Sequence, residues 1–544
     1  MKLSDYVMSY LKTVTDSIFL VSGGGCMHLV DSVRKSKLNA YCCHHEQGAA
    51  TAAEGYARLK NDIGVALVTT GPGGTNAVTS VAAAWMDCIP IMVISGQVRT
   101  DILIPRDNAG KPLLRQLAPQ EINIVDIVKP ITKSAVMVTD KNQIRYELEK
   151  ACHTAKSGKP GPVWIDIPLD IQSAEIEPEK LREFVKPEKP NYRLPTDKII
   201  AELQKAKKPL LLVGHGIRLA GAVDELWEFI EKTEINVVSA MSGDDLVTHD
   251  YPYYLGAQGI TGVESANKAF DDCDLLLIVG TRMQIRQTSF EYWDFAKNAV
   301  KIMVDIDEQE LHKKTLKLDI AVVADAKVFF KEMLKHNIKL NRWDVEFKPI
   351  IPQKINNYVD IYDFLHELSK LTNYHVVTTN GMACEANHQA FKLKKGQRLM
   401  TNTALGQMGK GLPMSIGACV ANNRKPVLCM EGDGSIMMNI QELQTLVHNK
   451  LPVKIFLFNN GGYYSIRNTH KRYFGIVFAA DKATGVSFPE WKKIAEAFGI
   501  EYFRIASNKD LSKLNGIINS NKAAFCELVI DPEQKMLAKW PYKK

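Results

Sequence analysis

The sequence signal that decides the fold lies in the last third of the chain, in the stretch Val427-Leu428-Cys429-Met430-Glu431-Gly432-Asp433-Gly434-Ser435. Its apolar residues are typical of a buried strand, and the Gly-Asp-Gly turn predicts the point where that strand gives way to a helix. We expect Ser435 to cap one helix, whose apolar residues continue at helical spacing from Ile436 to Val447. A strand, a glycine-rich turn and a helix N-terminus in this order favour the binding of a diphosphate.

A second polar residue follows the next apolar strand. Asn460 stands 27 residues after Asp433, just behind the run Ile455-Phe456-Leu457-Phe458. Carboxylate and amide oxygens are hard ligands suited to Mg²⁺, which binds through a few protein oxygens together with phosphate oxygens. Gly-Asp-Gly alone could be an ordinary turn, but its pairing with Asn460 predicts a Mg²⁺ site next to the diphosphate.

The pattern of a short apolar run, a Gly, Asp or Asn, and then a helical segment recurs along the whole chain. Such runs begin at Val65, Leu210 and Leu275. Continuous apolar strands that alternate with helices indicate parallel sheets covered on both faces. Polar, proline-containing stretches at 178–195 and 348–354 divide the chain. We therefore predict an α/β protein of three doubly wound parallel-sheet domains, at residues 1–180, 190–347 and 355–530, followed by a C-terminal tail at 531–544.

Composition and charge exclude several classes of protein. The chain has 544 residues, of which 46% are hydrophobic and 24% charged, as in ordinary globular proteins. The net charge of +7 is scattered, so neither a nucleic-acid nor a membrane surface is expected. The longest apolar stretches, such as residues 89–94, are too short to cross a bilayer. Ten cysteines without a Cys-x-x-Cys pair, and no secretion signal, predict a cytoplasmic protein.

A candidate proton-transfer residue lies in the first domain. Glu46 stands where an apolar strand that includes Tyr41 runs into a small-residue helix from Ala49 to Arg58. Burial at such a junction raises the pKa of a carboxyl group, so Glu46 can share or give a proton near neutral pH. A helix-capping or ion-paired glutamate is the alternative that the residues alone leave open.

Together with Gly71-Pro72-Gly73-Gly74-Thr75-Asn76, these motifs resemble the thiamine-diphosphate-dependent enzymes, and within them the acetolactate-synthase-like group. The resemblance also rests on His45-Glu46-Gln47-Gly48-Ala49-Ala50 and Gly406-Gln407-Met408-Gly409, and it covers nearly the whole chain. It is highly specific in the first and third domains and loose in the second. It implies a pyrimidine-binding first domain, a central domain, and a third domain that binds diphosphate and Mg²⁺.

The resemblance also implies roles for single residues. Glu46 is similar to the carboxylate that hydrogen-bonds the aminopyrimidine of the cofactor. Gln120 would lie near the reacting carbons, and Met408 would prop the cofactor into its bent shape. The other residues implied to bind the cofactor are Gly24, Gly25, Pro72, Asn76, Gly381, Met382, Gly406, Gly432, Asp433, Gly434, Ser435 and Asn460.

The metal site and the assembly follow from the same resemblance. Asp433, Asn460 and the backbone oxygen of Gly462 would hold Mg²⁺ on the diphosphate. Because this family places the glutamate on one subunit and the diphosphate site on its neighbour, we expect a homodimer or homotetramer with sites at subunit interfaces.

One departure from the family pattern concerns the acceptor pocket. Acetolactate synthases carry a Trp nine residues beyond the metal-binding Asn, and Thr469 stands there in this chain. The smaller, polar side chain predicts a wider pocket. The sequence leaves two acceptors open: a second 2-oxo acid or, given the wider pocket, a larger keto compound such as a nucleotide-linked keto-sugar.

A second departure concerns FAD, which acetolactate synthases bind in the second domain. This chain keeps the glycines Gly214 and Gly216 and the arginines Arg282 and Arg286. The two aspartates expected between those arginines are Gln284 and Ile285, and the Arg expected before Pro160 is Lys159. The sequence therefore leaves FAD open, with these residues facing either FAD or the acceptor.

The favoured function is that of a carboligase. It would decarboxylate a 2-oxo acid, pyruvate first among them, and transfer the two-carbon unit to a second carbonyl acceptor. A simple 2-oxo-acid decarboxylase is the alternative suggested by the pair His44-His45, since decarboxylases of this superfamily carry paired histidines. A non-catalytic paralogue is the third possibility, against which the intact Glu46, Asp433 and Asn460 argue.

Overall fold

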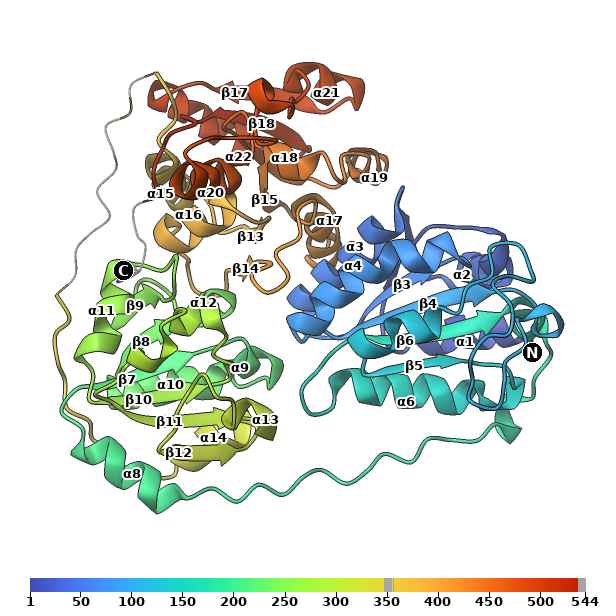
Figure 1. The fold of residues 1–544 in the computed structure, drawn as a ribbon, viewed down its shortest axis with the longest axis horizontal. Coiled ribbons are helices and arrows are strands. Elements are labelled where there is room, and N and C mark those ends of the chain that lie inside the picture. The colour runs from blue at the N-terminus through green and yellow to red at the C-terminus, as the bar shows by residue number, and fades with distance from the viewer. Residues whose placement is uncertain (347–354, 356, 537–544) are drawn as a thin grey trace.

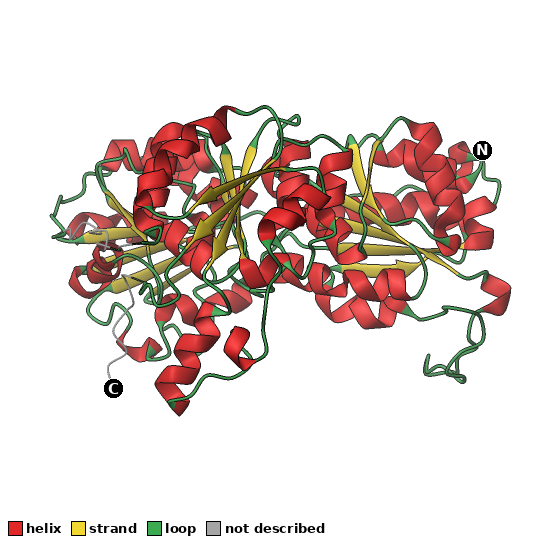
Figure 2. Cartoon of the chain, turned by 90° about the horizontal axis from the view of Figure 1, so that it is seen from above, coloured by secondary structure: helices red, strands yellow, loops and turns green. Residues whose placement is uncertain are grey.

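The computed structural model describes residues 1–346, 355 and 357–536, which form three α/β units (Figure 1). Each unit contains one six-stranded sheet, and every strand pair within the three sheets is parallel. Helices cover both faces of the sheets (Figure 2). The prediction of three doubly wound parallel sheets is therefore confirmed. The domain boundaries themselves stay predictions: the polar stretch 348–354 and residues 537–544 of the predicted tail lie outside the described residues.

The first sheet has the strand order β2-β1-β3-β4-β6-β5. Its inner strands β3 and β4 are completely buried because both faces are covered by helices. The elements are β1 (Ser17–Leu20), β2 (Asn39–Cys42), β3 (Gly64–Val68), β4 (Ile91–Gln97), β5 (Ser134–Met137), β6 (Val163–Pro168), α1 (Leu3–Leu11), α2 (Met27–Ser36), α3 (Glu46–Lys60), α4 (Pro72–Met86), α5 (Ile124–Val128), α6 (Ile144–Lys156) and α7 (Leu169–Ser173).

The central sheet has a different order, β12-β11-β10-β7-β8-β9. Counted along the chain this is the 3-2-1-4-5-6 arrangement of dinucleotide-binding folds. The elements are β7 (Pro209–Val213), β8 (Asn236–Ser239), β9 (Tyr254–Ala257), β10 (Leu275–Val279), β11 (Val300–Asp305), β12 (Ile320–Val323), α8 (Thr196–Lys205), α9 (Gly216–Leu219), α10 (Val223–Thr233), α11 (Glu264–Asp272), α12 (Ile285–Thr288), α13 (Glu308–Leu311) and α14 (Ala326–Met333).

The third sheet repeats the topology of the first, with the order β14-β13-β15-β16-β18-β17. The elements are β13 (His375–Thr378), β14 (Leu399–Met400), β15 (Val427–Gly432), β16 (Lys454–Asn459), β17 (Glu501–Ile505), β18 (Ala524–Val529), α15 (Ile361–Leu371), α16 (Met382–Ala390), α17 (Gly411–Ala421), α18 (Asp433–Ile436), α19 (Glu442–His448), α20 (Tyr464–Phe474), α21 (Trp491–Ala497) and α22 (Leu514–Asn519). In doubly wound sheets, ligands bind beyond the carboxyl ends of the strands where the strand order reverses. These switch points lie between β1 and β3, β7 and β10, and β13 and β15.

The single helix predicted from Ile436 to Val447 is wrong. Two short helices, α18 and α19, occupy this region, with a break at 437–441. Asn439 lies in the break, and its side-chain amide donates to the carbonyl of Gly409 at 2.6 Å. Asparagine side chains that bond to other backbone groups compete with helix formation in this way.

The first and third units pack together through α3 and α17. Gly55 of α3 and Gly417 of α17 lie where a Cβ atom would overlap the backbone of the facing helix. Glycine is therefore needed at both positions for the helices to approach so closely. A buried ion pair between Glu54 and Lys410, at 2.7 Å, lies in the same interface. It fixes the helix that begins at Glu46 against the segment that follows Met408.

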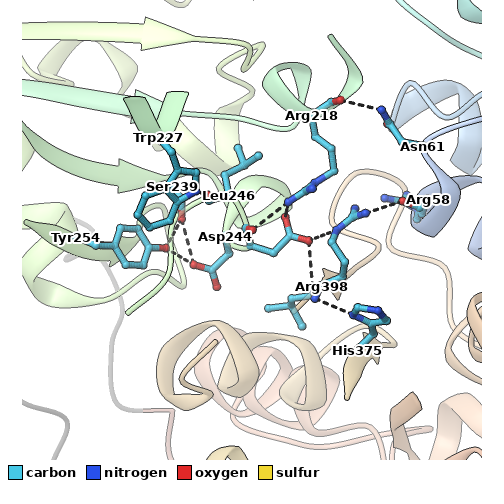
Figure 3. A network of polar contacts seen from close by, with 12 residues as sticks. Arg58, Asn61, Arg218, Trp227, Ser239, Asp244, Leu246, Tyr254, His375 and Arg398 are labelled. Atoms are coloured by element: carbon cyan, nitrogen blue, oxygen red, sulfur yellow. Dashed lines mark hydrogen bonds and ion pairs between the residues drawn. The ribbon is translucent and has the colours of Figure 1, made fainter. Parts of the chain in front are cut away.

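A network of polar contacts that includes Arg58, Arg218 and Arg398 joins all three units (Figure 3). Asp245 of the central unit accepts from Arg398 of the third unit at 2.5 Å and from Arg218 at 3.0 Å. Arg398 also donates to the carbonyl of Arg58 in the first unit at 2.8 Å, and Asn61 donates to the carbonyl of Arg218. These charge-assisted hydrogen bonds set the relative positions of the three sheets.

The helices are short relative to the thickness of a bilayer. Within residues 1–346 and 357–536, none combines the length and the apolar character needed to span a membrane.

Candidate active site

Glu46 begins α3 directly beyond β2, as the sequence predicted. Its side chain is 9% exposed, and its Oε2 accepts a hydrogen bond at 2.9 Å from the amide of Asn76 on α4. The N-terminus of a helix stabilises a carboxylate in its first turn. The structure therefore brings together two of the residues that sequence reasoning placed around the pyrimidine.

Other predicted residues of the first unit gather at the switch point between β1 and β3. Gly24 and Gly25 form a short turn after β1, and the N–H of Gly25 donates to the hydroxyl of Thr69 at 3.1 Å. Pro72 is the first residue of α4. Gln120 adopts a left-handed conformation (φ 60°), and a Cβ at Gly71 would overlap its carbonyl oxygen. The backbone of Gln120 therefore lies against the end of β3.

The predicted diphosphate side lies at the switch point of the third sheet, where Asp433 begins α18. One carboxylate oxygen accepts from the N–H of Gly434 at 2.7 Å, and the other accepts from Asn460 and Gly462, both at 3.1 Å. Burial raises the pKa of Asp433 to about 6, although these backbone N–H groups lower it. Within the described residues, no ion pair joins this carboxylate. A buried carboxylate without a cation suits the binding of a metal ion.

Asn460 and Gly462 lie close to Asp433 because β15 and β16 are neighbouring parallel strands. The amide oxygen of Asn460 is 3.3 Å from the guanidinium of Arg467, a buried residue that sequence reasoning missed. A Cβ at position 462 would overlap the carbonyl of Ala480, so only glycine fits there. Within the described residues, no three His, Cys, Asp or Glu side chains are grouped so that they could hold a metal ion. The predicted ligand set is of another kind, since it has one carboxylate, one amide oxygen and one backbone oxygen.

Ser435 does not cap a helix, contrary to the prediction. It is the third residue of α18, whose N-terminal cap is Gly432 without a side-chain bond. Its hydroxyl instead accepts from the N–H of Gly409 at 2.8 Å and pairs with the hydroxyl of Thr379 at 2.5 Å. This contact brings Gly432 and Gly434 next to the turn that carries Met408. Met408 is only half-buried, unlike a core methionine.

The remaining predicted residues of the third unit lie beside this site. Gly381 ends the turn after β13 with φ 74°, and Met382 begins α16. The sulfur of Met382 lies 3.9 Å from the amide nitrogen of Asn460. Gly406 accepts at its carbonyl from Asn380 at 2.7 Å. The segments after β13 and β15 therefore meet around one space.

The comparisons with known proteins agree with this geometry. Residues 1–126 match the N-terminal TPP binding domain of thiamine pyrophosphate enzymes, residues 196–333 their central domain, and residues 379–528 their C-terminal TPP binding domain. The chain belongs to the thiamine pyrophosphate enzymes.

Several curated members of this family are similar over almost their full length. The protein named "Probable acetolactate synthase large subunit" of Methanocaldococcus jannaschii is 33% identical, over 95% of this chain and 90% of that protein. The acetolactate synthase large subunit of Cyanidium caldarium is 32% identical, over 94% and 90%. The acetolactate synthase isozyme 2 large subunit of Escherichia coli is 32% identical, over 97% and 94%. This thiamine pyrophosphate enzyme is therefore acetolactate-synthase-like.

In this thiamine pyrophosphate enzyme, a cavity of about 1290 Å³ lies between the first and central units. It opens at the switch point between β7 and β10. Gln258 is a fully buried side chain in its wall, and neither polar atom of its amide has a hydrogen-bond partner among the described residues. Buried polar groups are normally paired, so this residue points to a ligand. The predicted residues that line the cavity are Lys159, Gly216, Arg282 and Arg286.

These residues differ in how they are engaged. Lys159 pairs with Asp307 at 3.0 Å and Glu310 at 2.7 Å. Arg286 lies 3.6 Å from Glu385 on α16. Among the described residues no ion pair engages Arg282, which leaves its charge available to an anionic ligand. Gly214, which is not among the lining residues, lies behind the wall, with its N–H bonded to the carbonyl of Val279.

Thr469 lies on α20, near the diphosphate side but on the exposed face of its helix. Its hydroxyl donates to the carbonyl of Ser465 at 2.8 Å, a bond within the helix. In the single chain it does not line the large cavity. Its role in acceptor choice stays a prediction.

Proposed function

We propose that this enzyme is a carboligase that decarboxylates a 2-oxo acid, pyruvate first among them, and transfers the two-carbon unit to a second carbonyl acceptor. Its relatives are named acetolactate synthase large subunits. The observation that carries the proposal is a pair of carboxylates, one at the helix that follows β2 in the first unit and one beyond β15 in the third. Glu46 is bound by Asn76 in the first unit, and Asp433 is buried without a cation in the third.

The residues of the third unit fit Mg²⁺ and a diphosphate. Asp433, Asn460 and the carbonyl of Gly462 would hold the metal, since they supply hard oxygen ligands at the end of two adjacent strands. Gly432, Gly434 and Ser435 would lie against the diphosphate. When bound, thiamine diphosphate supplies a nucleophilic carbon and accepts the electron pair released as CO₂ leaves.

The residues of the first unit would handle protons and orientation. Glu46 would hold a proton at the pyrimidine N1′, and Asn76 keeps its carboxylate pointed in one direction. Met408, half-buried on the turn before α17, would support the cofactor from the other side. Gly24, Gly25 and Gln120 would border the reacting carbons, and Pro72, Gly381, Met382 and Gly406 would border the cofactor.

We infer a homodimer or homotetramer, because apolar side chains beside the site are exposed in the single chain. Met437 and Met438 follow α18 and are 40% and 47% exposed, and Phe474 and Phe478 are at least 70% exposed. A second copy that covers them would complete each site. Analytical ultracentrifugation tests this assembly. All ten cysteines are unpaired, which favours the reducing cytoplasm.

We further propose that the cavity at the central sheet takes FAD. The dinucleotide-type strand order, the unpartnered Gln258 amide and the free charge of Arg282 support it. Purified protein should then show flavin absorbance, and Arg282→Ala should weaken flavin binding by about tenfold. A colourless protein that also fails to bind added FAD would contradict the proposal.

The histidine pair gives less support to the decarboxylase alternative. The ring of His45 accepts the N–H of Gln47 at 3.0 Å and so caps α3, and His44 is exposed in the single chain. His45 therefore has a structural role that explains its presence.

One reaction scheme separates the possibilities. The enzyme is incubated with pyruvate alone and with a series of carbonyl acceptors, and CO₂ and products are measured together by mass spectrometry. A carboligase releases CO₂ with a new carbon-carbon bond, a decarboxylase releases acetaldehyde, and a non-catalytic paralogue does neither. Acetaldehyde as the sole product would refute the proposal.

A further inference from the structure

Glu442 lies in the third unit, yet its side chain holds the turn before Glu46 of the first unit. It begins α19, shortly after Asp433 in the chain. Its Oε1 accepts the backbone N–H groups of His44 and His45, both at 3.1 Å. These two residues connect β2 to α3. One carboxylate therefore fixes the backbone directly before Glu46.

The residues around the Glu442 carboxylate bury it, donate a hydrogen bond to it and leave space for it. Glu442 is fully buried, and its Oε2 accepts the hydroxyl of Thr445 at 2.6 Å. The same hydroxyl lies 3.4 Å from the carbonyl of Cys42 at the end of β2. Gly48 provides the necessary space, because a Cβ at that position would overlap Oε1. Glu442 and Thr445 thus contact the chain on both sides of Glu46 in sequence, at residues 42, 44, 45 and 48.

We propose that Glu442 is a positioning residue for Glu46. Without its carboxylate, two buried N–H groups would lose their partner, and the turn would move to regain hydrogen bonds. Glu46 is the first residue after this turn, so the direction in which its carboxylate leaves α3 would change with it. This proposal rests on the proposed role of Glu46 in proton transfer.

The first test uses the protein without cofactor. Hydrogen–deuterium exchange is measured at the amides of His44 and His45 in wild type, Glu442→Ala and Glu442→Gln. We expect exchange to accelerate about tenfold in the alanine variant, since local opening becomes easier. Glutamine keeps an oxygen that can accept both N–H groups, so it should restore slow exchange.

A matched control separates this effect from general destabilisation. Asp360 is also a buried carboxylate that accepts two backbone N–H groups, from Tyr362 at 2.8 Å and Asp363 at 3.2 Å, but it caps α15. Asp360→Ala should lower the Tm while leaving the amides of His44 and His45 as slow as in wild type.

The second test measures exchange of the cofactor C2 proton in the loaded enzyme. Glu442→Ala should slow it by about tenfold, as loss of an outer-shell partner typically does, and Glu442→Gln should stay within about twofold. Gly48→Ala leaves Glu442 in place but pushes its carboxylate aside. It should therefore cause the same faster amide exchange and the same slower C2-proton exchange, and it replaces Glu442→Ala if that variant does not fold. The positioning proposal alone would be overturned by two results together. The amides of His44 and His45 would exchange at the wild-type rate in Glu442→Ala and in Gly48→Ala, while Glu46→Gln would still slow exchange of the C2 proton. A Glu46→Gln enzyme with a wild-type C2 rate would overturn the proposed function itself.

Discussion

The first and third sheets have the same strand order, but their switch points are built from different side chains. Beyond β3, the hydroxyls of Thr69 and Thr70 bond to the backbone of Gly25 and Gly96. Beyond β15, the carboxylate of Asp433 collects three backbone N–H groups. Both arrangements close the loops around a space, but only the carboxylate concentrates negative charge. The same strand order therefore carries neutral hydroxyls beyond β3 in the first unit and a buried carboxylate beyond β15 in the third.

The central sheet extends this comparison. Its order of strands differs from the other two, and its switch point opens into the large cavity between two units. Glycines close to β10 bring backbone segments together there: a Cβ at Gly216 would approach Gly280 too closely. The place of each candidate site follows from the topology, whereas its chemistry follows from a few side chains at that place.

The largest expected effect is at Asp433. Asp433→Ala should lower the affinity for Mg²⁺ and thiamine diphosphate together by at least about a thousandfold, since outer-shell partners alone are worth about 10–100-fold. Isothermal titration calorimetry in Mg²⁺ buffer measures this. Thr70→Val, at the neutral switch point, should leave the Mg²⁺ affinity within about twofold. Unchanged cofactor affinity in Asp433→Ala would mean that the third sheet holds no cation site.

The next effect is at Glu46, the acidic residue of the first unit. Glu46→Gln should slow exchange of the cofactor C2 proton by about a hundredfold, because an amide cannot share the proton at N1′. Cofactor affinity should change little, because diphosphate binding belongs to the third unit. Calorimetry and proton exchange on the same preparation check both parts. A large loss of affinity with normal exchange would reverse the assignment of the two units.

Much of the fold could be predicted from single segments of sequence. Continuous apolar runs such as β7 and β10 indicated buried parallel strands, and the Gly-Asp-Gly turn and Asn460 were correctly expected at the ends of neighbouring strands. The residues that were missed depend on contacts between distant segments. Glu442 is 397 residues from His45, and Ser435 bonds to Gly409 rather than to its own helix. Local patterns carry no information on such partners, and they also failed to show the break at Asn439.

A smaller effect concerns stability and pH, and it contrasts two buried carboxylates. Burial raises the pKa of Asp166 on β6 to about 7, although Ser95 and Gln97 hydrogen-bond to it. The folded chain thus keeps this proton until about pH 7, whereas the ordinary pKa of an Asp carboxyl group is 3.8. The stability gained from the protonated form is present below that value and is lost as the pH rises to 7, by at most about 1.4 kcal/mol per pH unit.

Asp166→Asn should remove this dependence. Relative to wild type, the variant should gain about 2.7 kcal/mol between pH 5 and pH 8, or roughly 8 °C in the Tm of the first unit. Differential scanning calorimetry at both pH values measures it. Because Asp166 lies inside the sheet rather than at a switch point, added Mg²⁺ should not alter the difference. A Mg²⁺-dependent shift would contradict the distinction between core and site carboxylates.

The smallest expected effect concerns Thr469, at the position where the sequence resemblance implies a tryptophan. Thr469→Trp would place an indole on the exposed face of α20, toward the surface that we expect a second copy to cover. An indole buries far more area than a threonine, so it should narrow the acceptor space. Differences in pocket shape are worth about 1–3 kcal/mol, so the product ratio between a small and a large keto acceptor should change by about tenfold in favour of the small one. Competition experiments with both acceptors, analysed by mass spectrometry, give that ratio directly.

Thr469→Ser retains the hydroxyl bond to Ser465 and should keep the wild-type ratio. An unchanged ratio in the tryptophan variant would place Thr469 outside the acceptor pocket and leave acceptor choice to other residues of the interface.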